Sequence, residues 1–145
     1  VRADDCVAHC VNTAFDVATW EIWCTLLNGA RLCIISQHVL LDLARFHDRL
    51  IEEKVTTLWL TVGLFNEVLD DLMPAFGQLR CLMVGGDALD VNKIRQLLNA
   101  DTAPQQLING YGPTETTTFA AMHHITALPE GAASVPIGRP IANTR

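Results

Sequence analysis

Short apolar runs alternate along this chain with longer segments whose apolar residues recur at helical spacing. The runs, residues 6–12, 31–35, 57–60, 80–86 and 105–110, have the length and composition of β-strands. Strands that alternate with helices of this length form βαβ units, which bring the strands into one parallel sheet. The runs are largely apolar, as expected when helices cover both faces of a sheet. The sequence therefore predicts an α/β fold in which a mostly parallel β-sheet carries helices on both faces.

Helices are expected between these strands. Their apolar positions are Trp20, Trp23, Cys24 and Leu27; Leu43, Phe46, Leu50 and Ile51; Phe65, Val68, Leu69 and Leu72; and Val91, Ile94, Leu97 and Leu98. Each set recurs at steps that place its members on one side of a helix, so we expect that side to be buried. Gly29 has the position of a C-terminal cap for the first helix, and Asp90 that of an N-cap for the last.

Length and charge limit what the chain can be. Its 145 residues, half of them hydrophobic, suffice for one domain, and we expect residues 1–145 to form a single unit with an irregular tail from about residue 127. A net charge of −6 without a basic run argues against nucleic acid or a membrane surface as a partner. No apolar stretch is long and uncharged enough to span a bilayer. Small molecules or proteins are the expected partners.

The cysteines indicate a reducing compartment. The chain has five of them, all within or beside apolar runs and without a CxxC pair, so buried free thiols fit better than disulfides or a zinc site. The first residues also lack the basic-then-apolar pattern of a secretion signal. We therefore expect a cytoplasmic protein.

Polar residues and glycines follow four of the predicted strands. They are Phe15–Asp16, residues 61–63, residues 85–87 and residues 109–112. Ligands of parallel sheets bind outside the carboxyl ends of the strands, so these four loops are expected to converge on one pocket. Taken singly, each also has a purely structural explanation: Asp16 could cap a helix, and the glycines could turn the chain.

Four segments in this order resemble the adenylation domains of nonribosomal peptide synthetases. They are FDVATWEIW (15–23), LRCLMVGGDAL (79–89), NGYGPTETT (109–117) and VPIGRPIANT (135–144). The resemblance covers the whole chain, which looks like the central part of the N-terminal domain of an adenylate-forming enzyme. It implies an amino-acid-activating ligase that uses ATP and Mg²⁺ to form an aminoacyl adenylate and pyrophosphate. The acyl group would then pass to the phosphopantetheine thiol of a peptidyl carrier protein.

The resemblance implies roles for the residues of the NGYGPTETT segment. Glu115 matches the family's magnesium ligand, and an oxygen ligand suits this hard cation. Thr114 matches the threonine that contacts the α-phosphate. Tyr111 would offer its ring to the adenine, and Asn109 its amide to the adenine's exocyclic amine. The remaining nucleotide-binding positions are Gly85, Gly86, Gly110 and Gly112.

Asp16 matches the aspartate that pairs with the substrate's α-ammonium group, which favours an amino acid as substrate. A carboxylate in a partly desolvated pocket is stable when a cation meets it. The other matched pocket positions are Val17, Trp20, Gly63, Met83, Gly85, Gly110, Thr118 and Phe119. None of them is charged, so a neutral substrate side chain is expected. Trp20, Met83 and Phe119 could equally be ordinary core residues.

Two other interpretations remain open. The chain could belong to an acyl-CoA or aryl-acid ligase of the same superfamily, whose substrates have no ammonium group for Asp16 to pair with. It could also be a non-catalytic remnant, or a cassette-encoded binding or scaffold protein, that self-associates through exposed sheet edges. Residues 1–145 lack the family's lysine-containing phosphate loop, ribose-binding aspartate and catalytic lysine. We therefore expect the isolated chain to be inactive.

Overall fold

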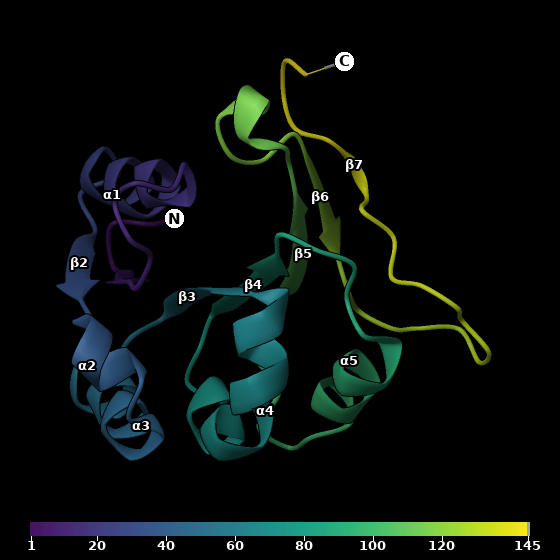
Figure 1. Ribbon diagram of the computed structural model, residues 1–145, viewed down its shortest axis with the longest axis horizontal. Coiled ribbons are helices and arrows are strands. Elements are labelled where there is room, and N and C mark those ends of the chain that lie inside the picture. Colours follow the sequence, from purple (N-terminus) through teal and green to yellow (C-terminus); the bar gives the residue numbers. More distant parts are fainter. Residues whose placement is uncertain (145) are drawn as a thin grey trace.

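The computed structural model describes residues 1–144, which form a seven-stranded sheet flanked by helices (Figure 1). In chain order the elements are β1 (Cys6–His9), α1 (Val17–Leu26), β2 (Arg31–Ile34), α2 (Gln37–Leu40), α3 (Leu43–Glu52), β3 (Thr57–Thr61), α4 (Val62–Phe76), β4 (Cys81–Gly85), α5 (Val91–Leu98), β5 (Leu107–Tyr111), the 3₁₀ turn η1 (Thr114–Thr116), β6 (Ala121–His124) and β7 (Arg139–Pro140). The strand order is β2-β1-β3-β4-β5-β6-β7. Strands β1 to β5 are parallel, whereas β6 and β7 run antiparallel at one edge. The predicted α/β fold is confirmed.

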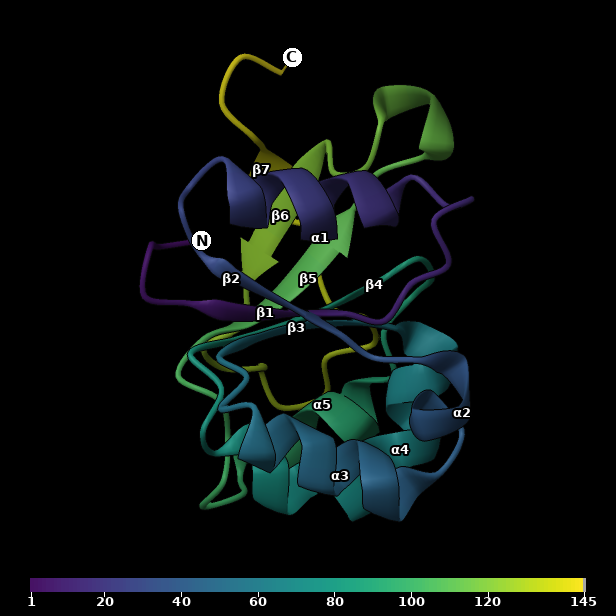
Figure 2. The ribbon, with the colours of Figure 1, turned by 90° about the vertical axis from the view of Figure 1, so that its left-hand side faces the viewer.

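The two faces of the sheet are covered unequally. Figure 2 shows α1 on one face and α3, α4 and α5 on the other. Successive side chains of a strand point to opposite faces, and β3 illustrates the result. Leu58 and Leu60 belong to the main core, whereas Trp59 belongs to a smaller cluster with Met83 and Phe119.

The main core explains why three helices dock where they do. Most of the apolar positions predicted for α3, α4 and α5 are buried there, including Phe46, Leu50, Phe65, Leu69 and Ile94, all of them at most 1% exposed. Ile51, also expected on the buried side of α3, is instead 42% exposed at the end of that helix. Burying one side chain of this size stabilises a fold by about 1.5–3 kcal/mol. Apolar spacing therefore predicted both the existence and the orientation of these helices.

Helix α1 departs from its predicted orientation. Trp23 and Leu27 were expected on the buried side, yet they are 54% and 79% exposed. The buried residues of α1 are Ala18, Glu21 and Thr25. Apolar residues occur on several sides of this helix, so spacing alone did not single out one face. A buried glutamate inside an apolar helix was not expected from the sequence.

The segment after β6 is mostly irregular. From about residue 127 to residue 144 it contains one short strand, β7, which pairs with Ala121 and Met122 of β6. Asn109 of β5 ties this segment down, because its side-chain amide donates to the Pro136 carbonyl at 2.9 Å. Among the described residues, none of the helices combines the length and the apolar character that crossing a membrane requires.

A buried ion pair, Asp5 with Arg80, joins the residue just before β1 to the residue just before β4. Asp5 is 3% exposed and accepts hydrogen bonds from the Arg80 Nε atom at 2.8 Å, from the Thr56 hydroxyl at 2.7 Å and from the Arg2 backbone at 2.7 Å. Burial alone would raise the pKa of Asp5, but these bonds and the charge of Arg80 outweigh it and lower that pKa to about 2.

Acid is expected to weaken the fold through this carboxylate. The pKa of Asp5 lies near its ordinary value of 3.8 in the unfolded chain and at about 2 in the folded one, so its stabilisation is complete above about pH 4 and is lost as the pH falls through 2. The loss amounts to about 2 kcal/mol of unfolding free energy. Urea denaturation as a function of pH measures it. The Asp5→Asn variant should lack this acid-dependent loss of unfolding free energy. If unfolding free energy depends on pH in the same way in both proteins, Asp5 is not its source.

Candidate functional site

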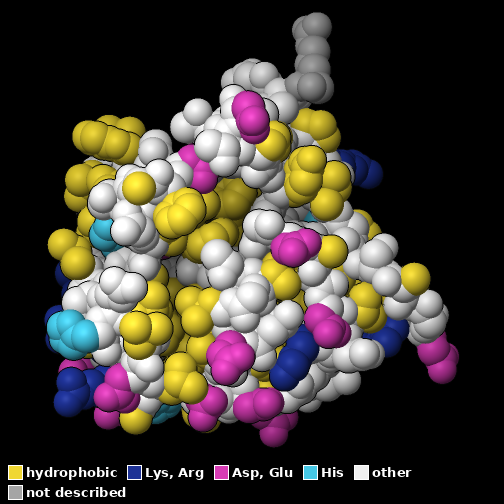
Figure 3. All heavy atoms as spheres, viewed as in Figure 1, with side chains coloured by type: hydrophobic (Ala, Val, Ile, Leu, Met, Phe, Trp, Pro, Cys, Tyr) yellow, Lys and Arg dark blue, Asp and Glu magenta, His cyan; other side chains and the backbone are white. Residues whose placement is uncertain are grey.

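Two adjoining cavities open at the carboxyl ends of the parallel strands, where the loops were predicted to converge. Cavity 1, of about 540 Å³, lies between the start of α1, the end of β3 and the loop after β5, residues 112–118. Hydrophobic side chains line the hollow that Figure 3 shows between these parts. Cavity 2, of about 430 Å³, lies between the loop after β4 and the segment around Val135 and Ile137. The cavities share four wall residues, Gly86, Gly110, Gly112 and Pro113.

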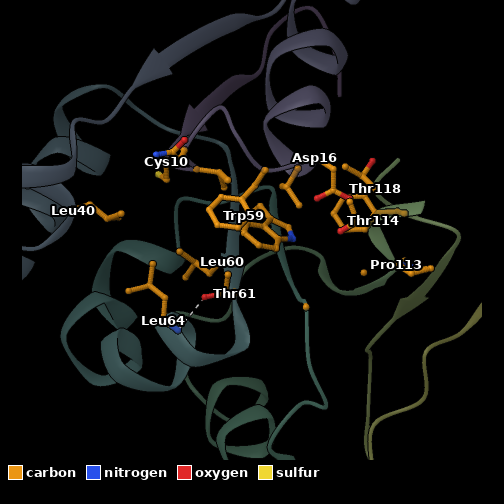
Figure 4. Close-up of a pocket in the computed structure, with 18 residues that line it drawn as sticks. Cys10, Asp16, Leu40, Trp59, Leu60, Thr61, Leu64, Pro113, Thr114 and Thr118 are labelled. Atoms are coloured by element: carbon orange, nitrogen blue, oxygen red, sulfur yellow. Dashed lines mark hydrogen bonds between the residues drawn. The ribbon is translucent and has the colours of Figure 1, made fainter. Parts of the chain in front are cut away.

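Asp16 brings a carboxylate to the wall of cavity 1. It stands at the N-cap position of α1, but its side chain accepts no hydrogen bond from the helix. The purely structural role considered from the sequence, that of a helix cap, is therefore not what the geometry shows. Figure 4 places Asp16 on the same side of the cavity as Thr114 and Thr118. The positive end of the α1 dipole favours a negative charge at this position.

The remaining surface of cavity 1 is mainly apolar. Its lining includes Val11, Phe15, Val17, Leu60 and Phe119, and among the described residues Asp16 is the only charged one that lines it. Cys10 also lines it, but burial, reinforced by the nearby Glu21 carboxylate, raises the pKa of this thiol well above its ordinary value. Cys10 therefore presents a neutral thiol, and the cavity is suited to a neutral group with one cationic end near Asp16.

Cavity 2 has the lining expected for a flat heterocycle. Asn109, Tyr111, Val135 and Ile137 contribute to its walls. Asn109 is almost fully buried and uses its amide nitrogen to hold Pro136, which leaves its carbonyl oxygen as the acceptor available to a ligand. Asp87 adds a charged side chain at the loop after β4. Largely apolar walls with one oriented amide can hold a ring and form hydrogen bonds with one of its edges.

The loop after β5 is held in a strained shape. A Cβ atom at Gly112 would lie 1.7 Å from the Thr118 carbonyl oxygen, so only glycine fits there. Thr117 and Thr118 both have positive φ, at 48° and 87°, which costs energy for a side chain branched at Cβ. The Thr118 hydroxyl donates to the Thr117 carbonyl at 2.9 Å. Thr114, which also lines cavity 1, is therefore the better placed hydroxyl donor toward a ligand.

Glu115 follows on the 3₁₀ turn and is exposed. It takes part in no ion pair within residues 1–144. Three or more His, Cys, Asp or Glu side chains nowhere gather as a metal site in the part of the chain that the structure describes. Magnesium, however, is commonly held by one or two carboxylates together with substrate phosphates, and the exposed Glu115 carboxylate next to Thr114 fits that pattern.

The residues predicted to contact a substrate fall into three groups. Asp16, Val17, Gly110, Thr118 and Phe119 line cavity 1. Trp20 and Met83 stand behind this wall: the Trp20 ring meets that of Phe119 edge-on at 5.8 Å, and both residues pack in the smaller core cluster. Gly85 pairs with Gly110 in the sheet beneath the cavities, whereas Gly63 lies exposed on α4 and lines neither cavity.

Trp59 is the main residue of cavity 1 that the sequence reasoning missed. It lies at the centre of the close-up in Figure 4, it is 5% exposed, and its indole nitrogen is buried without a hydrogen-bond partner. One signal was available: Trp59 stands near the carboxyl end of a predicted strand, where ligand-contacting residues are expected. The run around it is apolar on both sides, so the sequence did not show which side chain faces a cavity.

Known proteins are similar to this chain over most or all of its length. Residues 1–145 match the family model described as AMP-binding enzyme. Linear gramicidin synthase of Brevibacillus parabrevis is, in one of its subunits, 42% identical over 144 residues, which cover 99% of this chain and 2% of that subunit. Surfactin synthase subunit 3 of Bacillus subtilis (strain 168) is 41% identical over 132 residues, which cover 91% of this chain and 10% of that protein.

Solved structures share the fold. Holo-PA1221, described as an NRPS protein containing adenylation and PCP domains bound to a vinylsulfonamide inhibitor, has a TM-score of 0.85 and 35% identity, covering 96% of this chain and 24% of that one. The Klebsiella oxytoca NpsA N-terminal subdomain in complex with 3-hydroxybenzoyl-AMSN has a TM-score of 0.83 and 27% identity, covering 97% of this chain and 34% of that one. The chain thus spans at most about a third of each of these proteins.

Proposed function

Because this chain belongs to the AMP-binding enzyme family, which it matches over its whole length, we propose that it forms the ligand-binding centre of an amino-acid-activating adenylation domain. The observation that carries the proposal is the pair of adjoining cavities, one with an unengaged carboxylate at Asp16 and the other with the Asn109 amide. Two ligands bound side by side, an amino acid in cavity 1 and adenosine phosphate in cavity 2, would meet at the shared wall.

Each group then has a chemical task. Asp16 would hold the substrate's ammonium group, so that the substrate carboxylate points toward the shared wall. Tyr111 and Asn109 would hold the adenine, and the Thr114 hydroxyl would donate to the α-phosphate. The carboxylate oxygen would attack the α-phosphorus, and the bond to the departing pyrophosphate would break, which gives an aminoacyl adenylate. Fixing both reactants in this orientation is the main contribution that these residues can make.

Glu115 is the residue that we propose as the magnesium ligand. When bound there, magnesium would neutralise negative charge on the phosphates as pyrophosphate leaves. Glu115 would supply one oxygen to the ion from the exposed 3₁₀ turn. In the parent protein the acyl group would pass to the thiol of a carrier protein, in keeping with the adenylation and PCP domains of the solved PA1221 structure.

Two further expectations fit this assignment. The five cysteines are free thiols, which suits a reducing compartment such as the cytoplasm. The apolar lining of cavity 1 suits a substrate with a neutral side chain. Self-association stays a prediction. The exposed apolar residues Trp23 on α1, Leu27 just after it and Ile34 on β2 mark the surface that would carry it.

Calorimetric titration of the chain with ATP, with and without Mg²⁺, tests the nucleotide site. Glu115→Gln is expected to weaken binding of the Mg²⁺ complex by about tenfold, because a charge-assisted contact contributes about 1.5–3 kcal/mol. Binding of metal-free ATP should change little. Glu130→Gln, an exposed acid outside both cavities, serves as the matched control. Equal weakening of both forms of ATP would contradict the role of Glu115, and no ATP binding by the unaltered chain would contradict a preformed nucleotide site.

A further inference from the structure

Glu21 is a buried carboxylate that none of the proposed chemistry uses. It lies in the middle of α1, on the side that faces the sheet, and its exposure is 0%. Burying a charge is costly unless hydrogen bonds compensate for the lost water. Burial raises the pKa of Glu21, and the bonds from His9, Val11 and Cys10 act in the opposite direction. Because burying this carboxylate costs free energy, its presence calls for an explanation.

The side-chain hydrogen bonds of Glu21 all go to one short segment at the end of β1. Its Oε2 atom lies 2.5 Å from His9 Nδ1 and accepts from the Val11 backbone nitrogen at 3.3 Å. Its Oε1 atom accepts from the Cys10 backbone nitrogen at 3.4 Å. Both carboxylate oxygens therefore bind residues 9–11, where the strand ends and its ladder hydrogen bonds stop.

This segment and α1 form two walls of the same cavity. Cys10 and Val11 line cavity 1 from the strand side, whereas Asp16 and Val17 line it from the first turn of the helix. The intervening loop is short and closes on itself through the Asn12 carbonyl, which accepts from the Phe15 nitrogen at 2.9 Å. The hydrogen bonds of the Glu21 carboxylate form a second connection, from the middle of the helix back to the strand end. The two walls are thus joined by the carboxylate of Glu21 as well as by the loop.

Stability by itself does not account for Glu21. An apolar side chain of similar volume often replaces a buried charged group without loss of stability, whereas the charged group allows only the arrangement that satisfies its bonds. We propose that Glu21, together with His9, is a positioning residue that fixes the distance between the two walls of cavity 1. One wall is the first turn of α1, with Asp16 and Val17, and the other is the strand end, with Cys10 and Val11. This distance is the width of the cavity at its amino-acid end. The link to an amino acid rests on the function proposed above. The link between the two walls rests on the contacts alone.

Glu21→Leu and a pair of His9 variants test the proposal. In Glu21→Leu and His9→Leu, hydrogen exchange of the Cys10 and Val11 amides, followed by NMR, is expected to accelerate about tenfold. Calorimetric affinity for L-valine, L-leucine or L-phenylalanine, whichever binds best, should fall about tenfold in the same variants, while affinity for ATP stays constant. His9→Gln retains a side-chain N–H donor and should restore both properties. Thr25→Val removes a buried hydroxyl that donates to the Glu21 backbone carbonyl but leaves the bonds of the Glu21 carboxylate in place, so it should leave both unchanged.

The outcomes distinguish a failure of the positioning role of Glu21 from a failure of the proposed amino-acid binding. Unchanged exchange at Cys10 and Val11 in both leucine variants would overturn the positioning role. A joint fall of melting temperature, ATP affinity and amino-acid affinity would also overturn it, because Glu21 would then act only through general stability. If the unaltered chain binds none of these amino acids, the proposed function fails, and the exchange rates still decide whether Glu21 holds the two walls. If Glu21→Leu does not fold, the comparison of His9→Leu with His9→Gln decides the same question.

Discussion

Gly85→Ala is expected to destabilise the fold by about 3 kcal/mol, the largest effect on stability of any substitution considered for this chain. Gly85 ends β4 beside Gly110 of β5 in the central part of the sheet. A Cβ atom there would lie 2.1 Å from the Gly110 carbonyl oxygen, a backbone atom that cannot move away without separating the two strands. Urea denaturation followed by circular dichroism measures the change in unfolding free energy.

Gly63→Ala is the matched control, because it makes the same chemical change in an open place. A Cβ atom at Gly63 would have nothing within 4 Å, and the residue lies in the first turn of α4. Alanine is the better helix former, so this variant should gain about 0.5 kcal/mol. Similar losses in both variants would show that strand contact at Gly85 is not the cause.

Asp16→Asn is expected to reduce the affinity for an α-amino acid about a hundredfold, which corresponds to about 2.7 kcal/mol for a charge-assisted contact in a partly buried site. Asparagine keeps the size of the side chain and removes its negative charge. The expectation follows from the position of Asp16 in the wall of cavity 1, where its carboxylate serves no helix-capping bond. Calorimetric titration with L-phenylalanine or L-leucine in the presence of ATP measures the loss.

The des-amino analogues 3-phenylpropanoate and 4-methylpentanoate discriminate between the candidate substrate classes. They lack the ammonium group, so they should bind the unaltered chain weakly and gain rather than lose affinity in Asp16→Asn. Asp101→Asn, on the exposed loop before β5, is the charge-matched control. If the unaltered chain prefers the des-amino acids, the acyl or aryl-acid alternative replaces amino-acid activation.

Much of the fold could be predicted because the sequence expresses it locally. The spacing of Phe65 and Leu69, or of Ile94 and Leu97, fixes one apolar side on a helix, and all four side chains are buried as expected. Helix α1 shows where this reasoning fails. Trp23 and Leu27 have the same spacing but remain exposed, because the helix docks through Ala18, Thr25 and the hydrogen-bonded Glu21.

The candidate site could be predicted in part. Loops at the carboxyl ends of parallel strands meet at one edge of the sheet, and this rule located Asp16, Asn109 and Tyr111, each of which lines one of the two cavities. Thr114, which the family resemblance added, lines cavity 1 as well. The rule did not identify Trp59. Both faces of β3 are apolar, and both Trp59 and its neighbour Leu60 line cavity 1 at the end of the strand, so strand alternation did not single out Trp59.

The order of strands and helices, the parallel sheet and the set of loops at its carboxyl edge were determined by the amino-acid sequence alone, since hydrophobic periodicity and glycine-rich turns act over a few neighbouring residues. Only the tertiary structure decided which side of α1 is buried, that the Asp16 side chain accepts no hydrogen bond from the helix it precedes, and that Glu21 links that helix to the end of β1. These features depend on hydrogen bonds and packing between segments some ten or more residues apart, such as the eleven-residue separation of Cys10 and Glu21, and local spacing carries no record of such contacts.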